Sequence, residues 1–456
     1  MDETPVQRRA WWRRITLDVS PLRENRDYRL LWTGQLVSMC GSQLRYVAVP
    51  YQVYLLTKSP LAVGMIGLFQ ALPLMAFSLW GGVIADAVDR RKLLLVSQVG
   101  LALTSVAYAV GAQLGFATLP FLYAVTATAS SLAALDGPAR QSLIPTLVRR
   151  DQIPAAMTLN QVLFQTSGVL GPALGGLVIA RAGLQFAYWI DVVSYAAAIV
   201  AVAAMRTPQR TPGGARPGWS SLVEGLRYLG GHKVLLSTMA LDFVAMLFGW
   251  PRALFPFFAE EIFEVGPQGL GLLFAAPGAG ALLGALLGGW VSHVRRQGLA
   301  VLAAVVGWGV AIAGFGMLRT AFPLALFLLA VAGAADVFSA IFRGTILQME
   351  VPDHLRGRLT SVNLMVVITG PRFGEVESGV VASFTSPQFA VVSGGLACLV
   401  GVGAVMLFAP SLARWEMNPG AGPAGVEPAG PAQPAEQRDP GEGVRLDSGS
   451  TADDHR

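Results

Sequence analysis

Long apolar segments alternate with short polar connections along most of the chain. Twelve segments contain about 20 or more mainly apolar residues, the length that a helix needs to cross a bilayer. They cover residues 30–56, 61–85, 93–113, 118–140, 155–180, 184–205, 234–259, 267–292, 298–318, 322–345, 358–383 and 387–410. A bilayer admits only helices or closed barrels. These runs are apolar throughout, whereas the strands of a barrel would alternate between apolar and polar residues. The pattern therefore predicts an all-α membrane protein with twelve transmembrane helices.

The polar connections divide the basic residues unevenly between the two sides of such a bundle. Before the C-terminal tail, 23 lysine and arginine residues fall on the side of the N-terminus. The three that fall on the other side are Lys58, Arg181 and Arg319. Basic residues favour cytoplasmic connections, so we expect both termini in the cytoplasm and a multi-pass protein of the cell membrane. A wrong number of spans would scramble this alternation, which therefore supports twelve.

The composition excludes a soluble protein. Of 456 residues, 13% are charged and 53% are hydrophobic, whereas a soluble domain carries about 25% charged residues. Cys40 and Cys398 lie far apart, and the four histidines lie in connections or in the tail. We therefore expect no cofactor and no bound metal. The net charge of +5 is explained by the basic residues in the connections on the side of the N-terminus, so no nucleic acid partner is expected.

The widest polar break divides the spans into two sets of six. Residues 206–217 are rich in proline, glycine and arginine. Beyond them, Trp219, Leu222, Leu226 and Leu229 share one helical face, which predicts a short amphipathic helix on the membrane surface. We expect a cytoplasmic N-terminal segment (1–29), a first half (30–205), a linker (206–233), a second half (234–412) and a disordered cytoplasmic tail (413–456).

Features of the first set recur in the second. The pattern G-P-x-x-G at residues 171–175 of the fifth span returns at residues 370–374 of the eleventh. Arg45 stands shortly before a proline in the first span, as Arg252 does in the seventh. Each pair joins a span with the span six places later. This predicts a transporter of two pseudo-symmetric six-helix halves.

The connection between spans two and three places acidic residues before a basic cluster. It reads G-V-I-A-D-A-V-D-R-R-K, with its polar and glycine positions at Gly82, Asp86, Asp89, Arg90, Arg91 and Lys92. The run resembles the G-x-L-A-D-x-x-G-R-[RK]-[RK] pattern of the major facilitator superfamily, except that Ile84 takes the leucine position and Asp89 takes the second glycine position. The resemblance implies an inner latch, in which Asp86 accepts an arginine pair near a helix end. The alternative is a connection that is basic through topology alone.

The fifth span carries closely spaced glycines around a proline. These residues are Gly168, Gly171, Pro172, Gly175 and Gly176. They resemble the G-x-x-x-G-P-x-x-G-G motif of facilitator antiporters, which implies export instead of uptake. Small residues four apart also allow tight helix packing, so a purely structural interpretation stays open.

The resemblance covers residues 20–412 and is strongest to the enterobactin-exporter-like and drug-efflux branch. It rests further on residues 47–64, 136–148, 252–256 and 393–402. It implies the major facilitator fold, a protein that works as a monomer, and a cavity lined by spans one, four, seven and ten. One feature departs from the superfamily. Residues 119–131 contain no charge, so the arginine that relays protons in the fourth span of many drug exporters has no counterpart.

Several charged residues lie within the apolar spans. A charge at the bilayer centre costs about 2.5–3.5 kcal/mol on insertion scales, so each must have a partner or a function. The implied fold makes Arg45, Asp242, Arg252 and Asp336 candidates for the cavity. Our hypothesis is that Arg45 and Arg252 place two cations around an anionic or phenolic substrate, such as a catecholate siderophore. A structural ion pair with a carboxylate is the alternative for each.

The eleventh span carries Arg372, Glu375 and Glu377 within six residues. Arg372 and Glu375 are three residues apart and can pair, whereas Glu377 is expected to face elsewhere. One of these acids, or Asp242, is the candidate for proton coupling, because a desolvated carboxylate can load and release a proton. Structural pairing stays open for each.

Asp136 and Arg140 lie four residues apart near the inner end of span four. With Arg343 of span ten, they predict an inner gate. The chain has no G-x-x-x-x-G-K-[ST] loop for ATP and no H-E-x-x-H or G-x-S-x-G motif, so an enzyme is not indicated. We expect an exporter that exchanges protons for a siderophore or an amphiphilic drug-like molecule. A facilitator-fold importer, or a multidrug or macrolide pump with no siderophore role, is the alternative.

Overall fold

The computed structural model describes residues 18–87, 89–206 and 227–417, without the side chains of residues 78–87, 292, 353, 354 and 361. Most of the expected amphipathic helix lies outside the described residues, of which it shares 227–229, and so do most of the N-terminal segment and most of the tail. The described chain is helical and contains no strand. The prediction of an all-α protein is confirmed.

Six long helices form the first half. They are α3 (Arg26–Thr57), α4 (Pro60–Ala87), α5 (Arg90–Leu114), α6 (Leu119–Leu147), α7 (Ile153–Ala182) and α8 (Leu184–Ala203). Two short elements, α2 (Ser20–Glu24) and η1 (Arg150–Gln152), precede α3 and α7. Turn residues separate the long helices. Gly115 ends α5 with a φ of 72°, and Gly183 stands between α7 and α8 with a φ of 95°.

Six long helices also form the second half. They are α10 (Lys233–Phe248), α12 (Gly266–Leu287), α13 (Gln297–Met317), α14 (Phe322–Glu350), α15 (Asp353–Phe384) and α16 (Pro387–Phe408). The crossing that α10 begins continues through three short elements, which are η2 (Arg252–Leu254), α11 (Phe255–Phe257) and η3 (Phe258–Ile262). Two more short elements, η4 (Gly288–His293) and α17 (Pro410–Ala413), follow α12 and α16.

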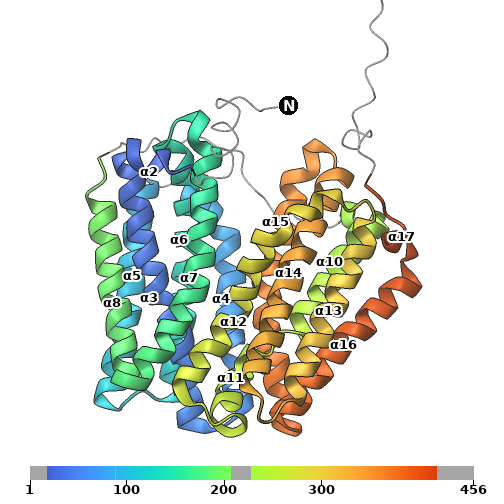
Figure 1. The fold of residues 1–456 in the computed structure, drawn as a ribbon. Coiled ribbons are helices and arrows are strands. Elements are labelled where there is room, and N and C mark those ends of the chain that lie inside the picture. Colours follow the sequence, from blue (N-terminus) through green and yellow to red (C-terminus); the bar gives the residue numbers. More distant parts are fainter. Residues whose placement is uncertain (1–17, 88, 207–226, 418–456) are drawn as a thin grey trace, which may run out of the picture.

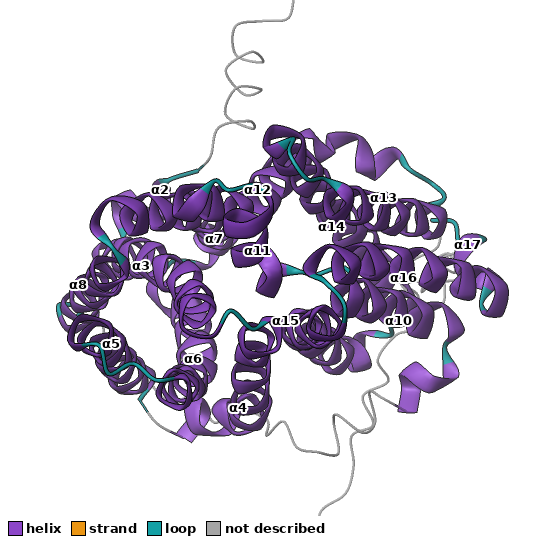
Figure 2. Ribbon diagram, turned by 90° about the horizontal axis from the view of Figure 1, so that it is seen from below, coloured by secondary structure: helices purple, strands orange, loops and turns teal. Residues whose placement is uncertain are grey.

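The two halves stand side by side and meet along two helix pairs. Helix α4 packs on α15, and α7 packs on α12. In Figure 1 the halves diverge toward the side where α2 and α17 lie, which we call the terminal side, and converge toward the opposite, far side. Figure 2 shows the same junction from below, with α4 and α15 adjacent and α7 next to α12. The far side is therefore where the halves are joined.

Backbones of the two halves touch at this junction. A Cβ atom added to Gly176 of α7 would lie 2.7 Å from the Cα of Gly271 in α12. A Cβ atom added to Gly379 of α15 would lie 2.9 Å from the Cα of Gly64 in α4. Only glycine permits such close approach without displacing a helix. The junction therefore depends on small residues in the helix pairs α7–α12 and α4–α15, which correspond to each other in the two repeats.

Ten of the described helical segments are long and apolar enough to cross a membrane. Helices α3 and α15 are not among them, although each has 32 residues and a length of about 48 Å. Both contain charged residues along their length, including Arg45 in α3 and Arg372, Glu375 and Glu377 in α15. The two exceptions thus include the helix that carries Arg45 and the helix that carries Arg372, Glu375 and Glu377.

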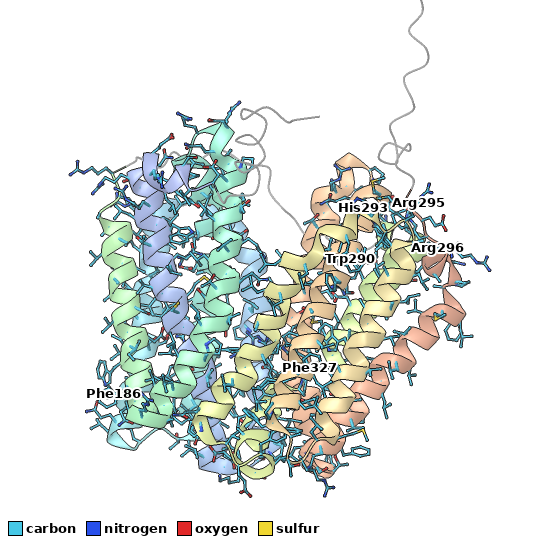
Figure 3. All side chains as sticks on the ribbon, viewed as in Figure 1. Phe186, Trp290, His293, Arg295, Arg296 and Phe327 are labelled. Atoms are coloured by element: carbon cyan, nitrogen blue, oxygen red, sulfur yellow. The ribbon has the colours of Figure 1, made fainter. Side chains whose placement is uncertain are left out.

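Large apolar side chains are exposed on the outer faces, as expected of a protein that is surrounded by lipid. Phe186 is 52% exposed and Phe327 is 61% exposed, and Figure 3 shows both away from the terminal side. Arg295 and Arg296, which follow η4, lie at the terminal side instead. A soluble monomer rarely exposes so much apolar surface.

Candidate substrate site at the junction of the halves

Tyr46 of α3 lies at the centre of a polar cluster that joins the two halves. Its hydroxyl accepts hydrogen bonds from Arg252 Nη1 at 3.3 Å and from Arg372 Nη1 at 3.1 Å. It donates one to Glu375 Oε1 at 3.2 Å. Arg372 and Glu375 also form an ion pair at 3.2 Å, as their spacing predicts. One hydroxyl of the first half thus contacts three charged side chains of the second, a network that we call the Tyr46 cluster.

Arg252 has no carboxylate within ion-pair distance in the described part of the chain. Its guanidinium carbon lies 4.2 Å from the ring centre of Trp250 and 5.8 Å from that of Tyr46. Its Nε atom is buried and has no hydrogen-bond partner among the residues that the structure describes. Aromatic faces stabilise a cation only in part, and a charge within a membrane span needs compensation. Arg252 therefore remains available to an anion.

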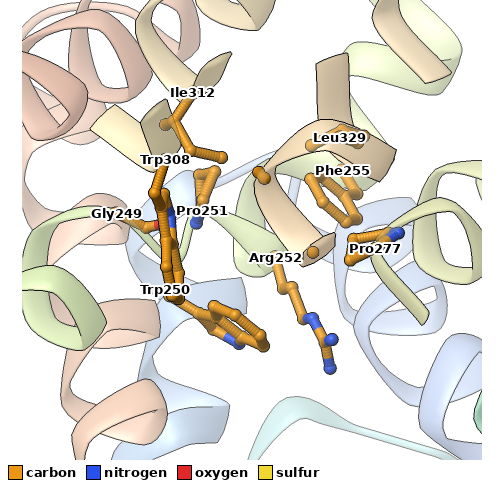
Figure 4. A pocket seen from close by; sticks show the side chains of 11 residues that line it. Gly249, Trp250, Pro251, Arg252, Phe255, Pro277, Trp308, Ile312 and Leu329 are labelled. Carbon is orange, nitrogen blue, oxygen red and sulfur yellow. The ribbon is translucent and has the colours of Figure 1, made fainter. Parts of the chain in front are cut away.

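A break in the seventh crossing positions Arg252. Gly249 ends α10, and Pro251 has no backbone N–H with which to continue the helix. Trp250 consequently lies in an unwound segment between α10 and η2, and Arg252 is the first residue of η2. Figure 4 shows both side chains at a pocket, with Trp308 beside Gly249. Interrupted membrane helices commonly form the substrate sites of transporters.

Two pockets adjoin at Arg252. The first lies inside the second half and has about 280 Å³ of unfilled space. The second lies between the halves, has about 250 Å³, and is lined by Tyr46, Gln70, Glu375 and mainly apolar neighbours. Gln70 Oε1 is buried without a hydrogen-bond partner. The junction thus brings together a cation that lacks a carboxylate partner, aromatic rings and polar atoms that have no hydrogen-bond partner among the described residues.

Arg45, the counterpart of Arg252 in the first half, is placed differently. Its Nε atom lies 3.4 Å from Asp191 Oδ2 of α8, and its other nitrogens donate to Ser105 and Tyr195. Asp191 is fully buried. The structure therefore does not bring Arg45 and Arg252 together around one cavity. The contacts of Arg45 fit the alternative interpretation, which is a structural ion pair.

Asp242 and Arg343 are paired inside the second half. Arg343 of α14 donates a hydrogen bond to Asp242 of α10, whose other carboxylate oxygen is buried without a partner. The sequence groups Arg343 with Asp136 and Arg140 in an inner gate. The structure does not join these three side chains. Asp136 and Arg140 form their own ion pair at 2.6 Å within α6.

Two further acids have no ion-pair partner among the described residues. Asp336 of α14 is half-buried, and the charges that act on it are those of Arg343, Asp242 and Arg252. Glu377 of α15 is half-buried as well, and its Oε2 atom is buried without a hydrogen-bond partner. Glu377 lies outside the Tyr46 cluster, in line with the expectation that it faces elsewhere.

The connection between α4 and α5 makes contacts within the first half. Asp89 caps α5 by accepting hydrogen bonds from the backbone N–H groups of Arg91 and Lys92 at 2.9 and 3.1 Å. The Arg91 side chain donates to the last carbonyls of α8, and Arg90 donates to a carbonyl of α6. The Asp89 side chain thus caps α5 through hydrogen bonds that a glycine cannot make. The Asp86 side chain and the contacts of Gly82 are not described, so the latch stays a prediction.

The glycine–proline motif of α7 contributes to two packing surfaces. Gly171 and Gly175 contact α3 within the first half, whereas Gly176 contacts Gly271 across the junction. The matching residues 370–374 of α15 pack on α10. The repeat seen in the sequence therefore corresponds to equivalent helix contacts in the two halves.

Two tyrosines of α3 join the halves nearer the far side. Tyr51 donates a hydrogen bond to Glu260 at 2.8 Å, and Tyr54 donates one to Glu261 at 2.9 Å. Both glutamates belong to η3. These bonds and the Tyr46 cluster fasten α3 to the second half over about two turns of helix.

The uncharged members of the site are absent from the sequence-based candidates. Tyr46, Trp250 and Gln70 stand in apolar runs, so a search for charged residues passes over them. Trp250 carried a usable signal, because Gly249 and Pro251 flank it and together indicate a helix break. Tyr46 and Gln70 had none, since their roles depend on contacts between halves.

A family match identifies the kind of protein. Residues 16–421 match the model of a family described as transmembrane secretion effector. The chain belongs to this family. Together with its fold, the match makes it a multi-pass membrane transporter of the major facilitator superfamily and not an enzyme.

Curated relatives of this family member include enterobactin exporters. One from Shigella boydii is 24% identical over 403 residues, which cover 88% of this chain and 96% of that protein. One from Citrobacter koseri is 25% identical over 415 residues, which cover 91% and 98% of the two chains.

Solved structures with the same fold are more distant in sequence. A bacterial homologue of the human lysosomal transporter Spinster, in an inward-facing and unoccupied conformation, has a TM-score of 0.67 at 14% identity and covers 88% of this chain and all of that one. A POT peptide transporter in complex with sulfate has a TM-score of 0.68 at 11% identity, with 86% and 96% covered. These likenesses support the fold alone.

Proposed function

We propose that this transporter is a secondary active exporter of a siderophore or an amphiphilic drug-like molecule. It works by proton antiport and alternating access in the cytoplasmic membrane, with both termini in the cytoplasm. The terminal side is then the cytoplasmic side, and the arrangement with a joined far side is the state that receives cargo from inside. The proposal rests mainly on the observation that Arg252, at the junction of the two halves, has no carboxylate partner among the described residues.

Three further observations support export of an anionic or phenolic cargo. The curated relatives are named enterobactin exporters. The basic residues gather on the terminal side, which fits a cytoplasmic face. Trp250, Tyr46 and Phe274 surround Arg252 with aromatic rings that suit a catechol.

Transport into inside-out membrane vesicles tests the direction and the driving force. Labelled enterobactin is expected to accumulate when the vesicle interior is acidified, and a protonophore should abolish the accumulation. A panel of amphiphilic antibiotics measured in the same vesicles separates siderophore export from multidrug efflux. Accumulation only in right-side-out vesicles would identify an importer and contradict the proposal.

The carboxylates within the spans are the candidates for proton coupling. They are Asp242, Asp336, Glu375 and Glu377. Asp242 and Glu375 are engaged by arginines, so cargo that draws an arginine away would leave them free to take up a proton. Transport by Asp242→Asn and Glu375→Gln, measured over a range of imposed pH gradients, decides between them. The variant at the coupling site should transport at a rate that no longer depends on the pH gradient. If the rates of both variants depend on the gradient as the parent's rate does, neither residue is the coupling site.

Alternating access requires the junction on the far side to open. A Cβ atom at Gly271 would lie 2.8 Å from the Cα of Gly176, so Gly271→Ala should disfavour the joined state by about 1–3 kcal/mol. Val63, which is buried at the junction, reports opening if it is replaced by cysteine in a background without Cys40 and Cys398.

An impermeant thiol reagent applied from the outside should label Val63→Cys about tenfold faster in Gly271→Ala than in the parent. The matched control is Gly403→Ala, where a Cβ atom meets nothing within 4 Å. Equal labelling in the two glycine variants would contradict opening at this junction.

A further inference from the structure

The connection between α12 and α13 repeats the arginine pair of the connection between α4 and α5, but without its acids. The first reads G-G-V-I-A-D-A-V-D-R-R over residues 81–91, and the second reads G-G-W-V-S-H-V-R-R over residues 288–296. They join spans two and three and spans eight and nine, so they are counterparts in the repeat. The second contains no aspartate or glutamate. Any acidic partner of its arginines must therefore come from elsewhere in the chain.

The helices that follow these connections begin differently. Asp89 caps α5 by accepting hydrogen bonds from two backbone N–H groups. No described side chain caps α13, which Arg296 precedes. The first N–H groups of a helix have no partner within it, so an acidic group is favourable near the start of α13. The C-terminal end of the described chain supplies one, because Glu416 Oε1 accepts a hydrogen bond from Arg296 Nε at 2.9 Å.

Residues 410–417, which we call the C-terminal clasp, lie across the start of α13. The backbone N–H of Met417 donates to the carbonyl of Arg295 at 2.8 Å, and Leu412 is fully buried. A Cβ atom added to Gly298 of α13 would lie 1.7 Å from the Leu412 carbonyl oxygen, so the clasp can pack this closely only on glycine. Figure 1 shows α17, which begins the clasp, at the terminal side next to α13.

The clasp also contacts the end of α14. Trp415 Nε1 donates to Glu350 Oε1 at 2.5 Å, and Glu350 is the last residue of α14. The Tyr228 hydroxyl donates to the backbone carbonyl of Glu350 at 3.4 Å, so the chain before α10 meets the same residue. The clasp therefore joins the start of α13 to the end of the helix that carries Asp336 and Arg343.

The first half has a counterpart of this fastening. Arg91, which corresponds to Arg296, donates to the carbonyls of Val202 and Ala203 at the end of α8, at 3.1 and 2.6 Å. In each half, the second arginine of the pair thus ties the start of the third span to the end of the sixth. The contact in the first half is with the helix itself. In the second half it is with a segment beyond α16, through side chains of Arg296 and Glu416 that are 71% and 55% exposed.

We propose that the C-terminal clasp is a detachable fastening that closes the second half on the terminal side and replaces the acids missing from the α12–α13 connection. Its polar contacts come from Trp415, Glu416 and Met417, and an exposed ion pair adds little stability, so the clasp can open without unfolding α13. Opening releases the start of α13 and the end of α14 together, because one segment binds both. The inference does not depend on the cargo or the direction of transport.

Hydrogen exchange of the full-length protein in nanodiscs, followed by mass spectrometry, tests the clasp. Gly298→Ala places a methyl group against the Leu412 carbonyl, so the amides of residues 412–417 should exchange at least tenfold faster than in the parent. Residues 347–351, at the end of α14, should also exchange faster. The matched control is Gly307→Ala in the same helix, where a Cβ atom meets nothing within 4 Å. It should exchange as the parent does in both segments.

Two further variants remove single contacts of the clasp. Trp415→Phe keeps an aromatic ring and loses the bond to Glu350, and Arg296→Gln loses the ion pair. Each should speed exchange of residues 412–417 about twofold to fivefold. Arg91→Gln, the counterpart in the first half, should instead speed exchange at the end of α8 and leave residues 412–417 unchanged.

Three results would overturn the clasp. They are fast exchange of residues 412–417 in the parent, equal exchange of these residues in Gly298→Ala and Gly307→Ala, and release of these residues without any change at residues 347–351. If Gly298→Ala does not fold, Trp415→Phe and Arg296→Gln decide, and unchanged exchange in both would overturn the proposal. Export is tested separately by transport in vesicles, so failure of the clasp leaves the proposed function untouched.

Discussion

The two halves carry an arginine at equivalent positions, and only one of them has a carboxylate partner among the described residues. Arg45 of the first half is held by buried Asp191, with Ser105 and Tyr195 as further acceptors. Arg252 of the second half has aromatic neighbours and one tyrosine hydroxyl. A buried charge with a complete set of partners is a structural element, whereas a charge without a counterion is available to a ligand.

The helices that carry the two arginines differ in the same way. Pro50 is accommodated within the continuous helix α3, but Gly249 and Pro251 end α10 and expose the segment before η2. Under the proposed function, we expect the first half to be the fixed partner and the second half to supply the surface that binds cargo. We therefore expect the two halves to differ in function despite their similar sequence patterns.

The largest effect is expected from removing the counterion of Arg45. Asp191→Ala leaves a buried guanidinium with hydroxyl partners only, and should lower the free energy of unfolding by about 3–5 kcal/mol. Thermal melting of the detergent-solubilised protein measures this loss. The double variant Arg45→Gln, Asp191→Asn should recover most of it, because no isolated charge remains. An unchanged melting temperature for Asp191→Ala would contradict the claim that the ion pair of Arg45 and Asp191 stabilises the first half.

A matched pair of tyrosines gives the next largest effect. Tyr46 and Tyr195 each accept a hydrogen bond from the arginine of one half, at 3.3 Å in both cases. Tyr46→Phe removes bonds to charged groups across the junction, worth about 1.5–3 kcal/mol, and should speed labelling of Val63→Cys from outside more than tenfold.

Tyr195→Phe should lower stability without changing that labelling, because its bonds lie inside the first half. Equal labelling rates for the two phenylalanine variants would show that the Tyr46 cluster does not hold the halves together.

The smallest effect concerns the cap of α5. Asp89→Gly installs the residue of the superfamily pattern and should cost only a few tenths of a kcal/mol, whereas Asp89→Ala should cost about 1 kcal/mol. Chemical denaturation of the purified protein can rank the two. Alanine that is no worse than glycine at this position would argue against capping as the role of Asp89.

Much of the fold follows from the sequence because the bilayer enforces it. Apolar length, the uneven placement of arginines and the recurrence of residues 171–175 at 370–374 all reflect rules that act along one helix or one connection. The same locality explains why the pairs Asp136–Arg140 and Arg372–Glu375 could be predicted from their spacing.

The site was harder to predict because its contacts join distant helices. Arg45 and Arg252 look alike in sequence, and only the approach of Asp191 in α8 separates them. Arg343 pairs with Asp242 of another helix, and the spacing of these residues in the sequence does not predict this contact. Tyr46 gains its importance from three residues that lie more than 200 positions away.

The most direct test of the account compares transport by two charge-removing variants at equal amounts of folded protein. The account predicts that Arg252→Gln keeps nearly parental stability and loses at least tenfold of its rate of enterobactin accumulation in acid-loaded inside-out vesicles. It predicts that Arg45→Gln, Asp191→Asn retains most of that rate. A parental rate for Arg252→Gln, with the loss falling on the double variant instead, would contradict the assignment of the free cation in the second half as the cargo-binding charge.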